Sequence, residues 1–409
     1  MKNNRIYLDY AATTPVDPAV LRVMKPYFSE KFGNPMSIHS YGQEAREAVE
    51  KARKQVADFL NCDPEEIIFT SGATESNNLA LKGVLRGFAS KSEKARIVTT
   101  RFEHHCVLES CLALEKNNEA EITYLPVYKD GIVRIGDIKK AIKPNTILVS
   151  IMYINNEIGT VQPIAEIGKL IKKINANKTN EAKKANKLFF HTDATQAINY
   201  FNCDVKKLNV DLLSLSGHKI YGPKGVGALY VKKGTPIKRI QDGGEQESGM
   251  RAGTHNVPGI VGLGEAIKQV QSSKLKVKSV LKLRNYLIKR VLKEIPNSYL
   301  NGSLKFRSPN NVNFRFDNVE GESVVLALDA ADIAASTGSA CTSSTLEPSH
   351  VLMALGLKHE QAHGSLRLTL GKNTTKRDID LTIDKLKDII KHLRKVSGEV
   401  LRGVLKGFK

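Results

Sequence analysis

The stretch Asp211–Lys219 reads DLLSLSGHK and brings a lysine to the end of a short apolar run, and Ile220–Gly225 continues it as IYGPKG. An apolar run that stops at small residues before a Gly/Pro-rich turn is typical of a buried strand ending at the rim of a sheet. An amine in a partly desolvated pocket there loses its proton more readily and can condense with an aldehyde. Ser216 and His218 beside it offer hydrogen-bond donors suited to a phosphate. The alternative is that Lys219 is an ordinary surface cation.

The composition is that of a soluble globular chain with room for two domains. Its 409 residues exceed one ordinary core, and 41% hydrophobic and 25% charged residues are usual for soluble proteins. No apolar stretch approaches the roughly 20 residues that span a bilayer, and the start lacks a signal-peptide core, so we expect no membrane association. The five cysteines show no metal-ligand spacing and leave an odd one in any pairing, which favours a reducing, cytoplasmic location and no metal: Cys62, Cys106, Cys111, Cys203 and Cys341.

The strongly basic balance raises the question of nucleic-acid binding. The chain has 62 Lys and Arg against 42 Asp and Glu, a formal net charge of +20. The lysines are spread along the chain, aromatic residues make up only 6%, and there is no Trp to stack on bases. We therefore expect no direct nucleic-acid function, and a basic surface for acidic partners is the favoured interpretation.

Apolar strands alternate with helical patterns through the first two thirds of the chain. Such alternation predicts a mostly parallel sheet covered on both faces, with these strands: Glu66–Thr70, Arg96–Thr100, Thr146–Met152, Leu188–His191 and Gly227–Val231. Beyond about Val257 the pattern changes to long Lys-rich helices, a strand at Asn311–Phe316 and a helical stripe of Ile379, Ile383, Leu386, Ile390 and Leu393. The sequence therefore predicts a large α/β domain and a smaller α+β domain.

Several polar groups follow the predicted strands. Gly72-Ala73-Thr74 lies where a strand feeds a helix, and free amides at a helix N-terminus favour a phosphate, although a simple cap is the alternative. Asp193 closes another strand, where it could pair with a protonated ring nitrogen or merely cap a helix. Arg367 lies in an alternating strand and could bind an α-carboxylate with two hydrogen bonds; a surface ion pair is the alternative.

One sulfur stands out on a loop of small residues. Ser336–Ser344 reads STGSACTSS, and the sulfur of Cys341 is its only large polarisable atom. A structural cysteine sits in apolar surroundings, whereas a loop of this composition, over residues 336–346, can carry a thiolate into a site and out again.

Two of these motifs resemble those of a known family. SxSGHK followed by YGPKG resembles the pyridoxal-phosphate (PLP) lysine segment of cysteine desulfurases of the NifS/IscS type, and the Cys341 loop with Leu346–Ser349 resembles that of their group I members. The resemblance covers residues from about 7 to 371. It implies a fold-type I PLP enzyme of the class-V aminotransferase family, a homodimer with a seven-stranded sheet. It also implies a large PLP-binding domain over 15–257 and a small domain over 1–14 plus 258–409.

The resemblance also implies roles for individual residues. Lys219 would carry the cofactor and remove the Cα proton, Asp193 would pair with the pyridine nitrogen, and His104 would stack on the ring and handle protons. The other cofactor contacts would be Ala73, Thr74, Asn156, Gln196, Ser216 and His218, with Thr254 of the partner subunit at the phosphate. Arg367 and Asn156 would hold the substrate. The run Gly243–Glu247 reads GGEQE, slightly different from the commoner GGGQE or GGGHE.

The implied activity is that of a cysteine desulfurase, a sulfurtransferase that converts L-cysteine to L-alanine and leaves a persulfide on Cys341. The sulfur would pass to an iron–sulfur scaffold protein or to tRNA thiolation, and Cys341 could transiently ligate a cluster. The alternatives are a selenocysteine lyase or another fold-type I PLP enzyme. From a different class, the alternative is a non-catalytic basic scaffold or nucleic-acid-associated protein, against which the intact Lys219, Asp193 and Cys341 speak.

Overall fold

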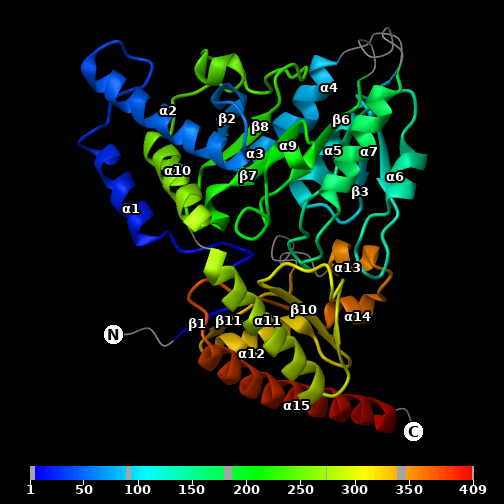
Figure 1. Ribbon diagram of the computed structural model, residues 1–409. Coiled ribbons are helices and arrows are strands. Elements are labelled where there is room, and N and C mark those ends of the chain that lie inside the picture. The colour runs from blue at the N-terminus through cyan, green and yellow to red at the C-terminus, as the bar shows by residue number, and fades with distance from the viewer. Residues whose placement is uncertain (1–4, 89–93, 179–186, 273, 339–346, 408–409) are drawn as a thin grey trace.

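The computed structural model describes residues 5–88, 94–178, 187–272, 274–338 and 347–407. Figure 1 shows two parts, a large twisted sheet with helices on both faces and a smaller sheet flanked by α11, α12 and α15. Among the described residues, no helix is long and apolar enough to cross a membrane.

The large sheet has seven strands in the order β2-β8-β7-β6-β5-β3-β4. Only β8 runs against its neighbours, which confirms the predicted mostly parallel seven-stranded sheet. The strands, in chain order, are β2 Ile67–Thr70, β3 Arg96–Thr100, β4 Glu121–Leu125, β5 Thr146–Ser150, β6 Phe189–Asp193, β7 Leu212–Ser216 and β8 Gly227–Val231.

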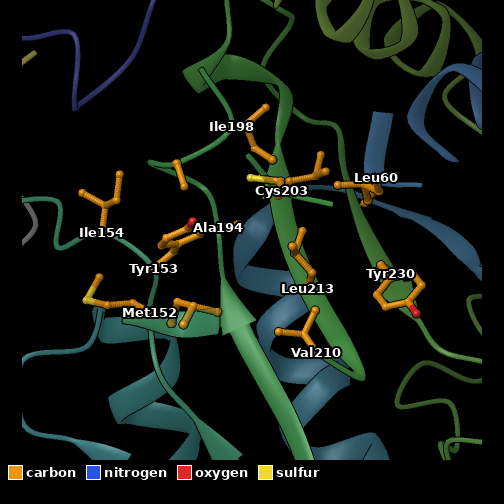
Figure 2. Close-up of a cluster of buried hydrophobic side chains, with 14 of the residues drawn as sticks. Leu60, Met152, Tyr153, Ile154, Ala194, Ile198, Cys203, Val210, Leu213 and Tyr230 are labelled. Atoms are coloured by element: carbon orange, nitrogen blue, oxygen red, sulfur yellow. The ribbon is translucent and has the colours of Figure 1, made fainter. Parts of the chain in front are cut away.

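Helices cover both faces of this sheet because successive strand residues point to opposite sides. Leu213 packs into the cluster that includes α2, α7 and α10, part of which Figure 2 shows, whereas Leu212 packs into the opposite cluster with α5. The helices of this part are α1 Pro18–Met24, α2 Ser40–Leu60, α3 Ala73–Asn78, α4 Val84–Gly87, α5 His105–Lys116, α6 Ile135–Ala141, α7 Ile164–Ala176, α9 Val205–Leu208 and α10 Val257–Ser272. Both faces being buried explains why the strands read as continuous apolar runs.

The smaller part has its own hydrophobic core. A three-stranded antiparallel sheet, β12-β10-β9, lies beside a short parallel pair of β1 and β11. The predicted stripe on α15 is buried in this core from Ile379 to Ile390, and Leu8 joins it from the N-terminus. The division into 15–257 and 1–14 plus 258–409 stays a prediction. The elements are β1 Ile6–Tyr7, α11 Lys274–Glu294, β9 Ser298–Leu300, β10 Asn311–Phe316, α12 Gly321–Asp329, β11 Ile333–Ala334, α13 His350–Ala354, α14 His359–His363, β12 Ser365–Thr369 and α15 Lys376–Gly407.

A buried carboxylate ties the segment after β8 to the sheet. Glu247 accepts two hydrogen bonds from the Arg53 guanidinium, at 2.8 and 2.7 Å, one from the Phe69 amide at 2.7 Å and one from His255 Nε2 at 2.7 Å. Burial alone would raise the pKa of this carboxyl, but the hydrogen bonds from Arg53 and His255 hold the pKa of Glu247 down at about 2. The GGEQE run is therefore fixed to α2 and β2 through its last residue.

Replacing Glu247 with Gln should lower the free energy of unfolding by about 3 kcal/mol at pH 7, because it leaves the buried Arg53 guanidinium without its counter-charge. The pKa of Glu247 is depressed in the folded state, so its stabilisation is present above the unfolded value of 4.5 and is lost as the pH falls towards 2. Urea unfolding of both proteins should therefore show a smaller difference at pH 3 than at pH 7.

Glu50→Gln is the matched control. Glu50 also bonds to Arg53, at 3.2 Å, but its side chain is 55% exposed against 1% for Glu247. An exposed pair of this kind contributes about 1 kcal/mol or less, so this variant should unfold almost as the wild type does. Equal losses in the two variants would show that burial of the pair is not what stabilises this loop.

Candidate functional site

The carboxyl ends of the central strands meet at a cavity of about 570 Å³, which also has walls from the N-terminal segment and from β12. Loops after parallel strands converge at one edge of a sheet, and ligands of open α/β proteins bind there. Ten of the residues predicted for the site line this cavity: Ala73, Thr74, His104, Asn156, Asp193, Gln196, Ser216, His218, Lys219 and Arg367.

Lys219 closes a single helical turn that directly follows β7. Its Nζ donates hydrogen bonds to the carbonyl oxygens of Ala11 and Ala12, each at 2.6 Å. His218 beside it contacts Thr13 Oγ1 through Nδ1 at 3.1 Å, and burial, helped by the charges of Lys219 and Lys224, lowers the pKa of His218 to about 4. The N-terminal segment thus holds the Lys219 amine inside the cavity, and Lys219 is not an ordinary surface cation.

Asp193 ends β6 with its carboxylate in the cavity wall. Oδ1 accepts the Thr195 amide at 2.9 Å, which is the capping bond considered as the alternative, and Oδ2 accepts Asn77 Nδ2 at 2.7 Å. Gln196 from the same turn donates to Ala11 O at 3.0 Å. Thr195 Oγ1 is buried in this wall and has no hydrogen-bond partner. The carboxylate therefore caps its own turn and faces the cavity at the same time.

The turn from β2 into α3 forms one end of the cavity. Gly72 precedes the helix at φ 152°, in the region that favours glycine, and a Cβ added there would lie 3.7 Å from Ser216 Oγ. Ala73 and Thr74 follow as the first helical residues, whose amides have no partner within the helix. The arrangement leaves room and backbone donors for an anion between this turn and the end of β7.

His104 is the N-cap of α5, just after β3. Its Nδ1 accepts the backbone amide of Cys106 at 3.2 Å, and the Cys106 sulfur lies 3.0 Å from the same nitrogen. Burial, with the positive charge of Lys219, lowers the pKa of His104, while Asp193 opposes the shift. The neighbouring His105 packs against the ring of His350, with 4.5 Å between centroids.

Arg367 is buried, at 3% exposure, so the alternative of a surface ion pair is wrong. Nη2 donates to Asp9 Oδ1 at 2.8 Å, and Nη1 donates to the carbonyl oxygens of Asn156 at 3.1 Å and Gly338 at 3.4 Å. Its Nε is buried without a hydrogen-bond partner although the residue lines the cavity. A donor left unpaired in this position suits a ligand that brings its own acceptor, such as a carboxylate.

Two predicted residues do not appear in this cavity. Thr254 is not among its lining residues. Cys341 lies outside the described residues, although Gly338, three positions before it, is part of the wall. Within the parts of the chain that the structure describes, no group of three or more His, Cys, Asp and Glu side chains could hold a metal ion.

Sequence reasoning missed Asp9, Asn77 and the pocket position of Cys106. The only signal for Cys106 was its place two residues after His104. Asp9 reaches Arg367 across 358 positions, and Asn77 reaches Asp193 across 116, so no local pattern could have joined either pair.

Comparisons with known proteins agree with this geometry. The aminotransferase class-V family model matches residues 6–382. The chain is 51% identical to the cysteine desulfurase IscS of Dictyoglomus turgidum, over 96% of both chains, and 46% identical to the human cysteine desulfurase, over 96% of this chain and 83% of that protein. A solved NifS-like protein superposes with a TM-score of 0.86 at 37% identity, covering 95% of this chain and all of the other. A structure of SspA in complex with cysteine gives 0.77 at 37% identity, covering 90% of this chain and all of that one. The chain belongs to the aminotransferase class-V family.

Proposed function

We propose that this protein is a PLP-dependent cysteine desulfurase that converts L-cysteine to L-alanine and takes the sulfur onto Cys341. The observation that supports the proposal is that Lys219, Asp193, His104 and Arg367 line one and the same cavity. Relatives matched over nearly the whole chain are named cysteine desulfurases, and one similar solved structure is titled as a complex with cysteine.

The residues present fit PLP. The unpaired, buried Thr195 Oγ1 and the free space beside Gly72 are the features expected of a pocket that receives a polar group. Lys219 would hold the aldehyde carbon and Asp193 the pyridine nitrogen, and the remaining contacts would come from Ala73, Thr74, Asn156, Gln196, Ser216 and His218. When bound, this cofactor supplies an electron sink for negative charge at the substrate Cα.

Side chains of the protein itself bind the substrate, move protons and accept the sulfur. Arg367, with Nε unpaired and Nη2 shared with Asp9, binds and orients the substrate carboxylate with charge-assisted hydrogen bonds. Lys219 removes the Cα proton, and His104 assists proton movement. The Cys341 thiolate forms a bond to the substrate sulfur as the Cβ–S bond breaks. One proton delivered to Cβ and one returned to Cα complete alanine, and Cys341 keeps the second sulfur as a persulfide.

The proposed partners follow from the family. A homodimer would bring Thr254 of the partner subunit to the cofactor phosphate, and the persulfide would pass to an iron–sulfur scaffold protein or another acceptor in the cytoplasm. The net charge of +20 supports an acidic acceptor surface.

Asp193→Asn should keep the fold but lower turnover by about 10²-fold or more, because a neutral amide cannot hold a proton on the pyridine nitrogen. Single-turnover alanine formation from L-cysteine measures the loss. Asp211→Asn is the matched control, since Asp211 is equally buried and accepts the Phe190 amide at 3.1 Å but does not line the cavity. Normal turnover of the Asp193 variant would leave this carboxylate with its capping role alone.

Cys341→Ser should still bind PLP and respond spectrally to L-cysteine, yet form no persulfide and release little alanine, because the serine hydroxyl cannot accept the sulfur. Mass spectrometry of the protein and an alanine assay check this. A selenocysteine lyase gives the opposite pattern, with the Ser variant still active on selenocysteine. Full alanine production from L-cysteine by Cys341→Ser would contradict the proposed reaction.

Mixing Lys219→Ala with Thr254→Ala subunits tests the dimer. If Thr254 serves the other subunit, each mixed dimer has one complete site, and random exchange should restore about a quarter of wild-type turnover. If Thr254 serves its own subunit, no site is complete and the mixture stays inactive. Gel filtration of each variant alone checks that both still dimerise.

A further inference from the structure

The start of α5 constrains the protonation of His104. The backbone amide of Cys106 points at His104 Nδ1 from 3.2 Å, and a backbone N–H can only donate. Nδ1 must then offer a lone pair, because a proton on it would face the amide hydrogen. A neutral imidazole has one ring proton, which leaves it on Nε2.

The Cys106 thiol reinforces the same state. Its sulfur lies 3.0 Å from His104 Nδ1 and receives Asn77 Nδ2 from the other side, also at 3.0 Å. Burial, with the negative charge of Asp193, raises the pKa of Cys106 to about 12, so the thiol keeps its proton at neutral pH. With Asn77 donating to the sulfur, the S–H is available to donate to His104.

The side-chain amide of Asn77 extends the network to Asp193 in the cavity wall. Asn77 Nδ2 also donates to Asp193 Oδ2 at 2.7 Å, so its two hydrogens serve Cys106 and Asp193. The charged groups that act on His104 are Asp193, Lys219, His105 and His350; only the first favours a second proton on the ring. Burial and the other three groups outweigh Asp193 and favour a neutral His104.

We infer that Cys106 is a positioning residue: its amide and thiol fix His104 as a neutral imidazole with its proton on Nε2, and Asn77 links this pair to Asp193. The catalytic consequence rests on the proposed function. In that reaction His104 offers a proton from Nε2 and cannot act as a base through Nδ1. Cys106 itself accepts no sulfur.

The tautomer is measured directly by nitrogen NMR of holoenzyme with ¹⁵N-labelled histidine rings, in which His104 is assigned by the signal lost in His104→Gln. We expect an unprotonated Nδ1 and a protonated Nε2 from pH 6 to 8. Cys106→Ala removes one hydrogen bond to the lone pair, worth about fivefold in the protonation equilibrium. The titration profile of the His104 ring, followed through its Nδ1 signal, should then move up by about 0.7 pH unit.

Cys106→Ser and Cys111→Ala separate positioning from general damage. Serine can donate to Nδ1 and accept from Asn77, so it should restore the wild-type profile. Cys111 lies on the same helix and in the same apolar cluster but does not contact His104, so its replacement should leave the His104 signals and their titration profile unchanged. A protonated Nδ1 in the wild type, or an Ala variant with the wild-type profile, would overturn the inference.

Thiol chemistry gives an independent test. A protonated, buried Cys106 should resist iodoacetamide at pH 8, as judged by peptide mass spectrometry of the holoenzyme. Rapid alkylation of Cys106, or sulfur from L-cysteine found on it, would show a reactive thiolate and contradict the assignment. Neither the NMR nor the alkylation result depends on desulfuration, so failure of the proposed activity would remain distinguishable from failure of this inference.

Discussion

The hydrogen bonds from the Lys219 amine to the carbonyls of Ala11 and Ala12 are the contact on which the cavity depends. Together with the contacts of Gln196 and His218, they join the turns after β6 and β7 to an N-terminal segment whose Leu8 is buried in the core of the smaller part. Two residues before Ala11, Asp9 holds the guanidinium of Arg367. One short stretch of backbone thus sets the spacing between the amine that would do chemistry and the cation that would hold a carboxylate.

The polar side chains of the cavity are held in place mainly by hydrogen bonds to one another. The side-chain amide of Asn77 donates hydrogen bonds to both Asp193 and Cys106. The Nδ1 atom of His104 lies within hydrogen-bond distance of both the thiol and the backbone amide of Cys106. Asn77 Oδ1 has no partner in this network, but each N–H of its amide has an acceptor, so few alternative proton positions remain without a donor facing a donor. Among the described residues that line the cavity, Thr195 Oγ1 and Arg367 Nε are buried and unpaired, and they lie where a ligand would supply the missing partner.

Much of the fold and site could be predicted because their signals are local. Continuous apolar runs mark strands buried on both faces, as Leu212 and Leu213 show by packing on opposite sides. Lys219, Asp193 and Ala73 stand directly after strands, so the sheet alone brings them together. Asp9 and Asn77 gave no such signal, since their partners are far away in sequence. Cys106 received no role from the sequence, because only the folded chain places its sulfur against His104.

The N-terminal segment has a consequence for the order in which the molecule can fold. Asp9 and Leu8 contact Arg367 and the backbone of Thr369, which are synthesised about 360 positions later. The large sheet can assemble while these partners are still being synthesised, whereas closing so long a loop must wait until Arg367 and Thr369 have been made. A nascent enzyme therefore completes its catalytic pocket last, and an early release of the chain yields a sheet without a site.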